Sequence, residues 1–270
     1  MKRLGKIGIL LLSAAFVSAG TIAAFAGMSR KIDLTAHRGD QTSAPENTLP
    51  AFEAAISRGA GWAEADIQQT KDGVLVVLHD ENLKRLAGVD KNVWDLSHEE
   101  LEALDIGSRY SPEFAGTRVP TLEQVIDVCR NRLKLNLEIK YSGHESQDYV
   151  AKILQIIDQK GMRDQCIFTS FCYDYVKQVK AAAPDIQAGL ITDNAAVDFS
   201  DYPEADLFSL KYTLINKDVV SKIHHMGKKV HVWTVNAYPD IKNCIDSGVD
   251  NIITDNSSYV KQIIRTNLNE

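Results

Sequence analysis

The chain lacks the usual signatures of a nucleotide-binding, redox or nucleic-acid-binding protein. Its 270 residues contain four cysteines but no Cys-x-x-Cys pair, so the sequence indicates neither a zinc site nor a dithiol redox site. It has no Gly-x-x-x-x-Gly-Lys loop for nucleoside triphosphates and no Gly-x-Ser-x-Gly turn for a serine nucleophile. The net charge is -6, and no basic cluster mixed with aromatics follows the first residues, which argues against nucleic acid as a partner.

The composition predicts an ordinary globular core. Apolar residues make up 44% of the chain and charged residues 24%, and 270 residues suit one large domain or two small ones. Most of the cysteines have an apolar neighbour, so we expect small buried thiols. A disulfide stays open as the alternative, although a domain of this size does not need one. The cysteines are Cys129, Cys166, Cys172 and Cys244.

The first 29 residues differ in kind from the rest. Three basic residues among the first six precede an uncharged run over residues 7–29. This run is long enough for a membrane-spanning helix, which needs about 20 apolar residues, and the basic residues favour a cytoplasmic N-terminus. Residues 24–26, Ala-Phe-Ala, resemble a signal-peptide cleavage site, so a cleaved signal is the alternative. Either interpretation places residues 30–270 outside the cytoplasm, anchored to the membrane if the segment is uncleaved.

From residue 32 onward, short apolar runs alternate with helical patterns. The candidate strands cover residues 32–37, 63–68, 135–140, 167–171, 188–192, 207–210, 230–235 and 251–254. The helical patterns cover residues 49–58, 122–130, 147–160, 173–183, 217–226 and 239–247, with a last helix from residue 258. The link between the fifth and sixth strands is too weak to predict a full helix.

This alternation predicts an α/β fold with a parallel sheet and right-handed crossovers. Eight repeats in roughly 240 residues is the size of a (β/α)8 TIM barrel, with a doubly wound open sheet as the alternative. Residues 30–270 are therefore expected to form one barrel domain behind the N-terminal hydrophobic segment. Thr121 with Gln124, and Ser97 with Glu100, have the spacing of helix capping boxes.

One segment breaks the rhythm after the second predicted strand. Asp72-Gly73 is a strong hairpin signal between two strand-like runs, so we expect an antiparallel return strand. This hairpin would bring Asp66 opposite the neighbourhood of His79. Residues 81–119 then form an insertion before the next barrel helix.

The alternation of side chains along the strands places three carboxylates inside the barrel. Glu64 and Asp66 share one face of the second strand, and Glu138 shares a face of the next with Lys140. Buried charges are costly unless they are paired or coordinate a metal. Oxygen-only ligands suit Mg²⁺ or Ca²⁺, so we predict a divalent cation here. A structural ion pair between Lys140 and either Glu64 or Glu138 is the alternative.

Two histidines at strand ends lie on the same predicted rim. His37 ends the first strand and His79 ends the return strand, and histidine suits acid–base chemistry near neutral pH. Cleavage of a phosphodiester needs a base for the nucleophile and an acid for the leaving alkoxide. Arg38 and Lys140 suit a phosphate anion. The remaining histidines are expected to be structural: His98, His144, His224, His225 and His231. For His231, an orientation into the barrel beside Trp233 stays open as the alternative.

Several motifs together resemble the glycerophosphodiester phosphodiesterase family. The first two blocks are His37-Arg38-Gly39 with Pro45-Glu46-Asn47-Thr48, and Glu64-x-Asp66 with Thr70-Lys71-Asp72-Gly73 and His79-Asp80. The later, weaker ones are Glu138-Ile-Lys140, Trp233-Thr-Val-Asn236 and Ile253-Thr254-Asp255. The resemblance covers residues 33–257. One departure is Asn256, where the family often has proline, and it concerns the last loop only.

The resemblance implies a TIM barrel with a small insertion and hydrolysis of a glycerophosphodiester to an alcohol and glycerol 3-phosphate. It also implies the roles of the site residues: an acid–base pair of His37 and His79, a divalent-cation site of Glu64, Asp66 and Glu138, phosphate contacts from Arg38 and Lys140, and a glycerol-side wall from Trp233. The nucleophile is either water or the glycerol hydroxyl, the latter through a cyclic phosphate.

Three alternatives to this function remain open from the sequence: a lysophospholipase D-type enzyme, a phosphodiesterase of wall glycerophosphate polymers, and a non-catalytic binding barrel. We also expect the 81–119 insertion to select the substrate, because it leaves from the active-site rim. Trp94, Tyr110 and Phe114 would then wall the mouth or cover a choline-like headgroup. Alternatively, these aromatics join the small core of Leu96, Leu101 and Leu104.

Overall fold

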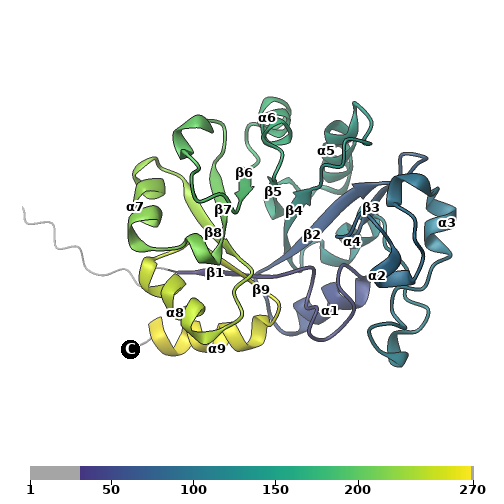
Figure 1. The fold of residues 1–270 in the computed structure, drawn as a ribbon, viewed down its shortest axis with the longest axis horizontal. Coiled ribbons are helices and arrows are strands. Elements are labelled where there is room, and N and C mark those ends of the chain that lie inside the picture. Colours follow the sequence, from purple (N-terminus) through teal and green to yellow (C-terminus); the bar gives the residue numbers. More distant parts are fainter. Residues whose placement is uncertain (1–30, 269–270) are drawn as a thin grey trace, which may run out of the picture. The chain divides into compact units, whose positions relative to one another are not determined.

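A closed barrel of eight parallel strands forms the centre of the computed structural model, which describes residues 31–268 (Figure 1). Around the barrel the order is β1-β9-β8-β7-β6-β5-β4-β2, and β2 pairs back onto β1. The barrel strands are β1 Asp33–Ala36, β2 Trp62–Gln69, β4 Lys134–Ile139, β5 Cys166–Ser170, β6 Ala188–Thr192, β7 Leu207–Lys211, β8 Lys229–Trp233 and β9 Asn251–Thr254. The closure confirms the predicted TIM barrel and excludes the open sheet.

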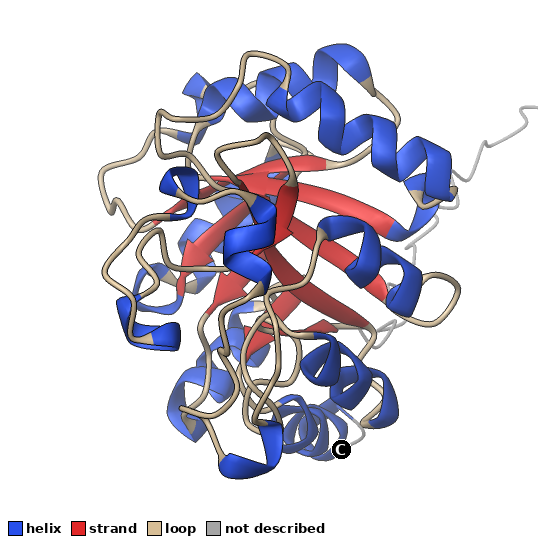
Figure 2. Ribbon diagram, turned by 90° about the vertical axis from the view of Figure 1, so that its right-hand side faces the viewer, coloured by secondary structure: helices blue, strands red, loops and turns tan. Residues whose placement is uncertain are grey.

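Helices surround the strands, as Figure 2 shows. Their bounds are α1 Leu49–Ser57, α2 Lys84–Ala87, α3 His98–Glu102, α4 Leu122–Cys129, α5 Tyr149–Lys160, α6 Tyr173–Ala182, α7 Lys217–His225, α8 Tyr238–Ser247 and α9 Ser257–Leu268. Short 3-10 turns lie at Val93–Asp95, Pro112–Phe114, Arg163–Gln165, Phe199–Asp201 and Tyr212–Leu214. Only one such turn links β6 to β7, in agreement with the weak helical pattern of that segment.

The alternation of apolar and acidic residues along β2 explains why carboxylates point into the barrel. Ala63, Ala65 and Ile67 are fully buried in the apolar core. Glu64 and Asp66 therefore take the opposite face and point into the barrel. The next strand repeats the pattern in register, because Asp66 lies beside Glu138 in the β2–β4 pairing. The predicted inward faces of both strands are confirmed.

The predicted hairpin after β2 is also present. β3 (Leu75–Val77) pairs antiparallel with the outer end of β2, with Val77 opposite Ile67. The backbone N–H of Leu78 donates to the carbonyl oxygen of Asp66 at 2.9 Å. His79 therefore enters the rim at the level of Asp66, as the sequence predicted.

Residues 81–119, which contain α2 and α3, build a small core beside the barrel together with Val76 and Leu78 of the hairpin (Figure 1). Leu96 and Leu101 are buried in it, as expected, and the predicted capping box holds the N-terminus of α3: Ser97 Oγ accepts from the Glu100 N–H at 3.3 Å. The second predicted box, at the start of α4, is present as well. The insertion thus has internal packing that fixes the shape of its loops.

His231 lies inside the barrel, where burial determines its properties. It is 5% exposed, and its Nδ1 has no hydrogen-bond partner among the described residues. Burial lowers the pKa of His231 to about 4. The ring is therefore neutral at physiological pH, which fits the structural role expected of it.

Two features bear on the environment of the chain. All four cysteines are free thiols; Cys172 is half-buried and the other three are buried. Within residues 31–268, the structure contains no helix with both the length and the apolar character that crossing a bilayer requires. The predicted signal or anchor over residues 1–29 lies outside the described part of the chain.

Candidate active site

A cavity of about 150 Å³ opens at the C-terminal ends of the barrel strands. Seven of the eight predicted site residues are among those that line it: His37, Arg38, Glu64, His79, Glu138, Lys140 and Trp233. The eighth, Asp66, is 1% exposed and contacts this set. The fold therefore gathers every predicted site residue at one place, the face of a TIM barrel where active sites lie.

Three carboxylates form the floor of this site. One oxygen from each of Glu64, Asp66 and Glu138 lies within 4.8 Å of the other two. Glu64 Oε1 and Asp66 Oδ1 are buried and accept no hydrogen bond from any described residue, although Lys140 Nζ forms an ion pair with Asp66 Oδ1 at 3.3 Å. Buried acceptors are rarely left this way without a missing partner. The donor set is all oxygen, so the site fits a hard divalent cation.

Lys140 neutralises part of this charge. Its Nζ lies 2.8 Å from Glu138 Oε1 and 3.3 Å from Asp66 Oδ1. Despite its burial, Asp66 has a pKa held well below the usual range by the charges of Lys140, His79 and Arg38. The ion pair considered as the alternative to a cation is thus present for Glu138, and Lys140 pairs with Asp66 as well, whereas it forms no ion pair with Glu64.

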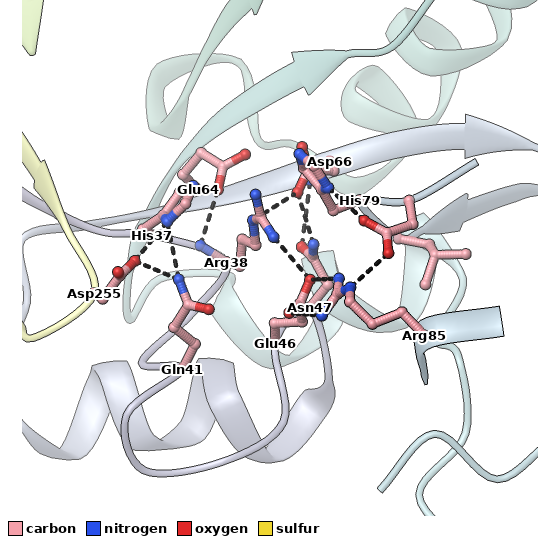
Figure 3. Close-up of polar contacts among 12 residues, drawn as sticks. His37, Arg38, Gln41, Glu46, Asn47, Glu64, Asp66, His79, Arg85 and Asp255 are labelled. Carbon is pink, nitrogen blue, oxygen red and sulfur yellow. Dashed lines mark hydrogen bonds and ion pairs between the residues drawn. The ribbon is translucent and has the colours of Figure 1, made fainter. Parts of the chain in front are cut away.

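Glu64 is held by an unusual backbone. Arg38 has a φ of 55°, in the left-handed region that few side chains adopt, and its N–H donates to Glu64 Oε2 at 2.8 Å (Figure 3). This bond holds the carboxylate and leaves Oε1 without a hydrogen-bond partner among the described residues. Burial, together with the charges of Asp66 and Glu138, raises the pKa of Glu64 well above its ordinary value. A cation at this position would offset the same repulsion.

His37 is oriented by a carboxylate that the sequence analysis left without a role. His37 Nδ1 lies 2.6 Å from Asp255 Oδ1, and Gln41 donates to the same oxygen. Asn236 Nδ2 donates to Asp255 Oδ2 at 2.7 Å. With Nδ1 engaged, the Nε2 atom of His37 is the one available for chemistry in the cavity (Figure 3).

His79 has a similar contact in a different electrostatic setting. Its Nδ1 lies 2.8 Å from Asp80 Oδ1, but Asp80 Oδ2 also accepts from Arg85 Nε at 2.6 Å. Burial lowers the pKa of His79; the charge of Asp66 opposes this, and the charges of Lys140 and Arg38 add to it. The carboxylate beside His37 is held by neutral amides, whereas that beside His79 is shared with a guanidinium. The two histidines are therefore not equivalent.

The residues that buttress the site were largely missed by sequence reasoning. Glu46 Oε1 accepts from Arg38 at 2.8 Å and from Arg85 at 2.7 Å, so it links the barrel rim to the insertion. Asp255 directly follows β9, and Asn236 lies three residues beyond the end of β8. Their positions after the C-terminal ends of barrel strands were the signal that could have identified them. For the pairing of Glu46 with Arg85, 39 residues away, the sequence offers no signal.

The aromatics of the insertion do not take the place expected of them. Trp94 stacks on His144 with ring centroids 4.3 Å apart, in a separate groove. Tyr110 and Phe114 pack edge to face against each other at 5.5 Å. None of the three is among the residues that line the cavity, where the aromatic walls are Trp233 and Phe171, 5.7 Å apart.

Comparisons with known proteins agree with this geometry. The model of the glycerophosphoryl diester phosphodiesterase family matches residues 37–258. A glycerophosphodiester phosphodiesterase of Caldanaerobacter subterraneus subsp. tengcongensis is 34% identical over 239 residues, covering 85% of this chain and 96% of that protein. One of Bacillus altitudinis is 32% identical, covering 82% and 93%.

Solved structures show the same relationship. A phosphodiesterase from Oleispira antarctica, determined in complex with the product sn-glycerol-3-phosphate, superimposes with a TM-score of 0.82 at 27% sequence identity. The match covers 86% of this chain and 96% of that one.

Proposed function

The chain belongs to the glycerophosphoryl diester phosphodiesterase family and is a glycerophosphodiester phosphodiesterase, and we propose that it works with a divalent cation and two histidines. The observation that carries the proposal is the convergence of three carboxylate oxygens within 4.8 Å, in a cavity that His37 and His79 also line. The product bound by the Oleispira antarctica relative supports sn-glycerol 3-phosphate as the product here.

Glu64, Asp66 and Glu138 would hold the cation, which we propose to be Ca²⁺ or Mg²⁺ because the ligands are all oxygen. When bound, such an ion polarises the phosphoryl oxygens and stabilises charge in the transition state. Arg38 and Lys140 line the same cavity and present the remaining positive charge to the phosphate. Trp233 closes the glycerol side, where its Nε1 donates to the carbonyl of Ser209 at 3.0 Å.

The different settings of the two histidines suggest their roles. Asp255, held by neutral amides, stabilises the imidazolium that forms when His37 takes a proton from the attacking hydroxyl group of water or glycerol. As the new bond to phosphorus forms, the bond from phosphorus to the leaving alcohol oxygen breaks, and His79 gives that oxygen its proton. Attack by water yields glycerol 3-phosphate directly, whereas attack by glycerol yields a cyclic phosphate that water then opens. The lowered pKa of His79 makes its protonated form a stronger acid than an ordinary imidazolium.

The direct test is hydrolysis of glycerophosphocholine by the purified protein, with products followed by phosphorus NMR. We expect sn-glycerol 3-phosphate and choline in the presence of Ca²⁺ or Mg²⁺, and no turnover in chelator. Phosphocholine and glycerol would show that the wrong ester bond had been assigned. Full turnover in chelator would remove the cation from the mechanism.

Asp255→Asn is expected to lower kcat about 10- to 100-fold, a part of the 10²–10⁴-fold that a positioned acid–base group contributes. The change keeps the shape of the side chain but removes the charge that orients His37 and stabilises its protonated form. KM and cation affinity should hold, because Asp255 is not one of the three cation ligands.

The control for this prediction is a double-mutant cycle. In a His37→Ala background, Asp255→Asn should cost little more, because both act through one imidazole. An undiminished loss in that background would show that Asp255 acts through something other than His37.

We propose that residues 1–29 direct the barrel out of the cytoplasm, as a signal or as an anchor. The support is the basic start followed by the uncharged run over residues 7–29. Protease added to intact cells should digest the barrel if it is anchored. If the segment is cleaved, the barrel should be recovered from the medium. Full protection, together with recovery from the cytosol after lysis, would contradict this localisation.

A further inference from the structure

A second hollow lies beside the cavity and meets it at the phosphate-binding end. This groove has a volume of about 480 Å³, and it shares Glu138, Lys140 and Phe171 with the cavity. Its other walls come from the start of the insertion and from the ends of β4 and β5. They are Glu81, Ile139, Tyr141 and Cys172.

The cavity and the groove differ in chemistry. Beyond the charged cluster, the cavity presents an amide and hydroxyl groups from Asn136, Thr169, Ser209 and Thr234. Such groups suit the hydroxyls of glycerol. The groove instead presents aromatic rings and a carboxylate. A phosphodiester bound at Lys140 would therefore place its two ester groups in unlike surroundings.

The rings of the groove are exposed to an unusual degree. Tyr141 is 62% exposed and Phe171 52%, the two highest values among the exposed large hydrophobic side chains of residues 31–268. Both rings are braced from behind: Tyr141 packs edge to face on Tyr175 at 5.8 Å, and Phe171 on Trp233 at 5.7 Å. Covering two such solvent-facing rings with a ligand is thermodynamically favourable, because it removes aromatic surface from water.

Apart from the shared Glu138 and Lys140, Glu81 is the charged residue of the groove. Its carboxylate is exposed and makes no hydrogen bond or ion pair with any residue in the described range. Its backbone is held nonetheless, because the N–H of Val93 donates to its carbonyl oxygen at 2.9 Å. An exposed, unpaired carboxylate on a held backbone, beside two aromatic rings, is a combination that attracts an organic cation.

We propose that this groove binds the leaving alcohol of the substrate and prefers one that carries an ammonium group. The glycerol phosphate would lie in the cavity, the phosphate beside Lys140, and the ammonium between Glu81, Tyr141 and Phe171. The inference rests on the proposed function, to which it adds the direction of the substrate and its preferred class.

The first test compares kcat/KM on glycerophosphocholine with that on glycerophosphoglycerol, whose leaving alcohol is neutral. Glu81→Gln and Tyr141→Leu should each lower the ratio of the two values about five-fold, within the range of cation–π and exposed ion-pair contributions. The matched control is Glu102→Gln, an exposed glutamate of the same insertion that does not line the groove. It should leave the ratio at the wild-type value. Lysophosphatidylcholine, with the same headgroup, tells whether an acyl chain is tolerated.

The second test needs no turnover. Cys172 lines the groove and is the one cysteine that is not buried, so iodoacetamide should alkylate it selectively. Tetramethylammonium chloride should slow this alkylation, sodium chloride at equal ionic strength should not, and Glu81→Gln should weaken the protection. Hydrolysis of both substrates with unchanged ratios and no protection would overturn the groove assignment alone. Failure to hydrolyse either substrate would instead overturn the proposed function.

Discussion

Asp66→Asn and Glu64→Gln are each expected to weaken cation binding by at least about 10²-fold and to remove nearly all activity. Changes that merely perturb the support of a metal ligand already cost 10–100-fold, and these remove a charged ligand itself. The carboxylates converge within 4.8 Å, and buried oxygens on both Glu64 and Asp66 accept no hydrogen bond from the described residues. The measurement is a calorimetric titration with Ca²⁺ and Mg²⁺, next to the activity assay.

The control for these variants is Asp127→Asn, an exposed carboxylate on α4 that pairs with Lys160. It changes the net charge equally and should leave cation affinity and turnover at the wild-type level. Unfolding curves in the absence of metal separate loss of the site from loss of the fold. Wild-type cation affinity in a correctly folded Asp66→Asn protein would refute the ligand assignment.

His37→Ala and His79→Ala are each expected to lower kcat by about 10²–10⁴-fold, the usual contribution of a positioned acid or base. Both imidazoles are oriented through Nδ1 by a carboxylate and line the cavity above the acidic cluster. Cation affinity should change little, because neither histidine belongs to the three-carboxylate set. His225→Ala, on the exposed side of α7, is the matched control.

A substrate with a more acidic leaving group separates the two roles. Glycerol phosphate esterified to p-nitrophenol needs little proton donation when its P–O bond breaks. His79→Ala should therefore recover most of its lost rate on this ester, whereas His37→Ala should remain slow. Equal losses of both variants on this substrate would contradict the assignment of His79 as the acid.

The positions of the site residues could be predicted from the sequence where local patterns decide them. The sequence placed Glu64, Asp66 and Glu138 correctly because strand periodicity alone decides which face a side chain takes, and an apolar alternate face must pack on helices. It placed His37 and His79 at the rim for a similar reason: the strand limits and the Asp72-Gly73 turn are local signals.

Partners that meet across long sequence distances could not be inferred in this way. Asp255 reaches His37 over 218 residues, and Arg85 reaches Glu46 from within the insertion. The prediction that the insertion aromatics wall the mouth of the active site was wrong for the same reason. No local sequence signal determines where the insertion loop packs. Trp94 instead stacks on His144, which belongs to the loop after β4.

The sequence by itself determined the alternation of strands and helices, the hairpin and the inward-facing site residues, since these follow from hydrophobic periodicity and from local turn chemistry. Only the tertiary structure decided how loops from different strands meet. The left-handed backbone of Arg38 that holds Glu64, and the groove that joins Glu81 to Tyr141 and Phe171, belong to this second kind. Loop conformations depend on packing against distant segments, and no periodicity in the chain encodes those contacts.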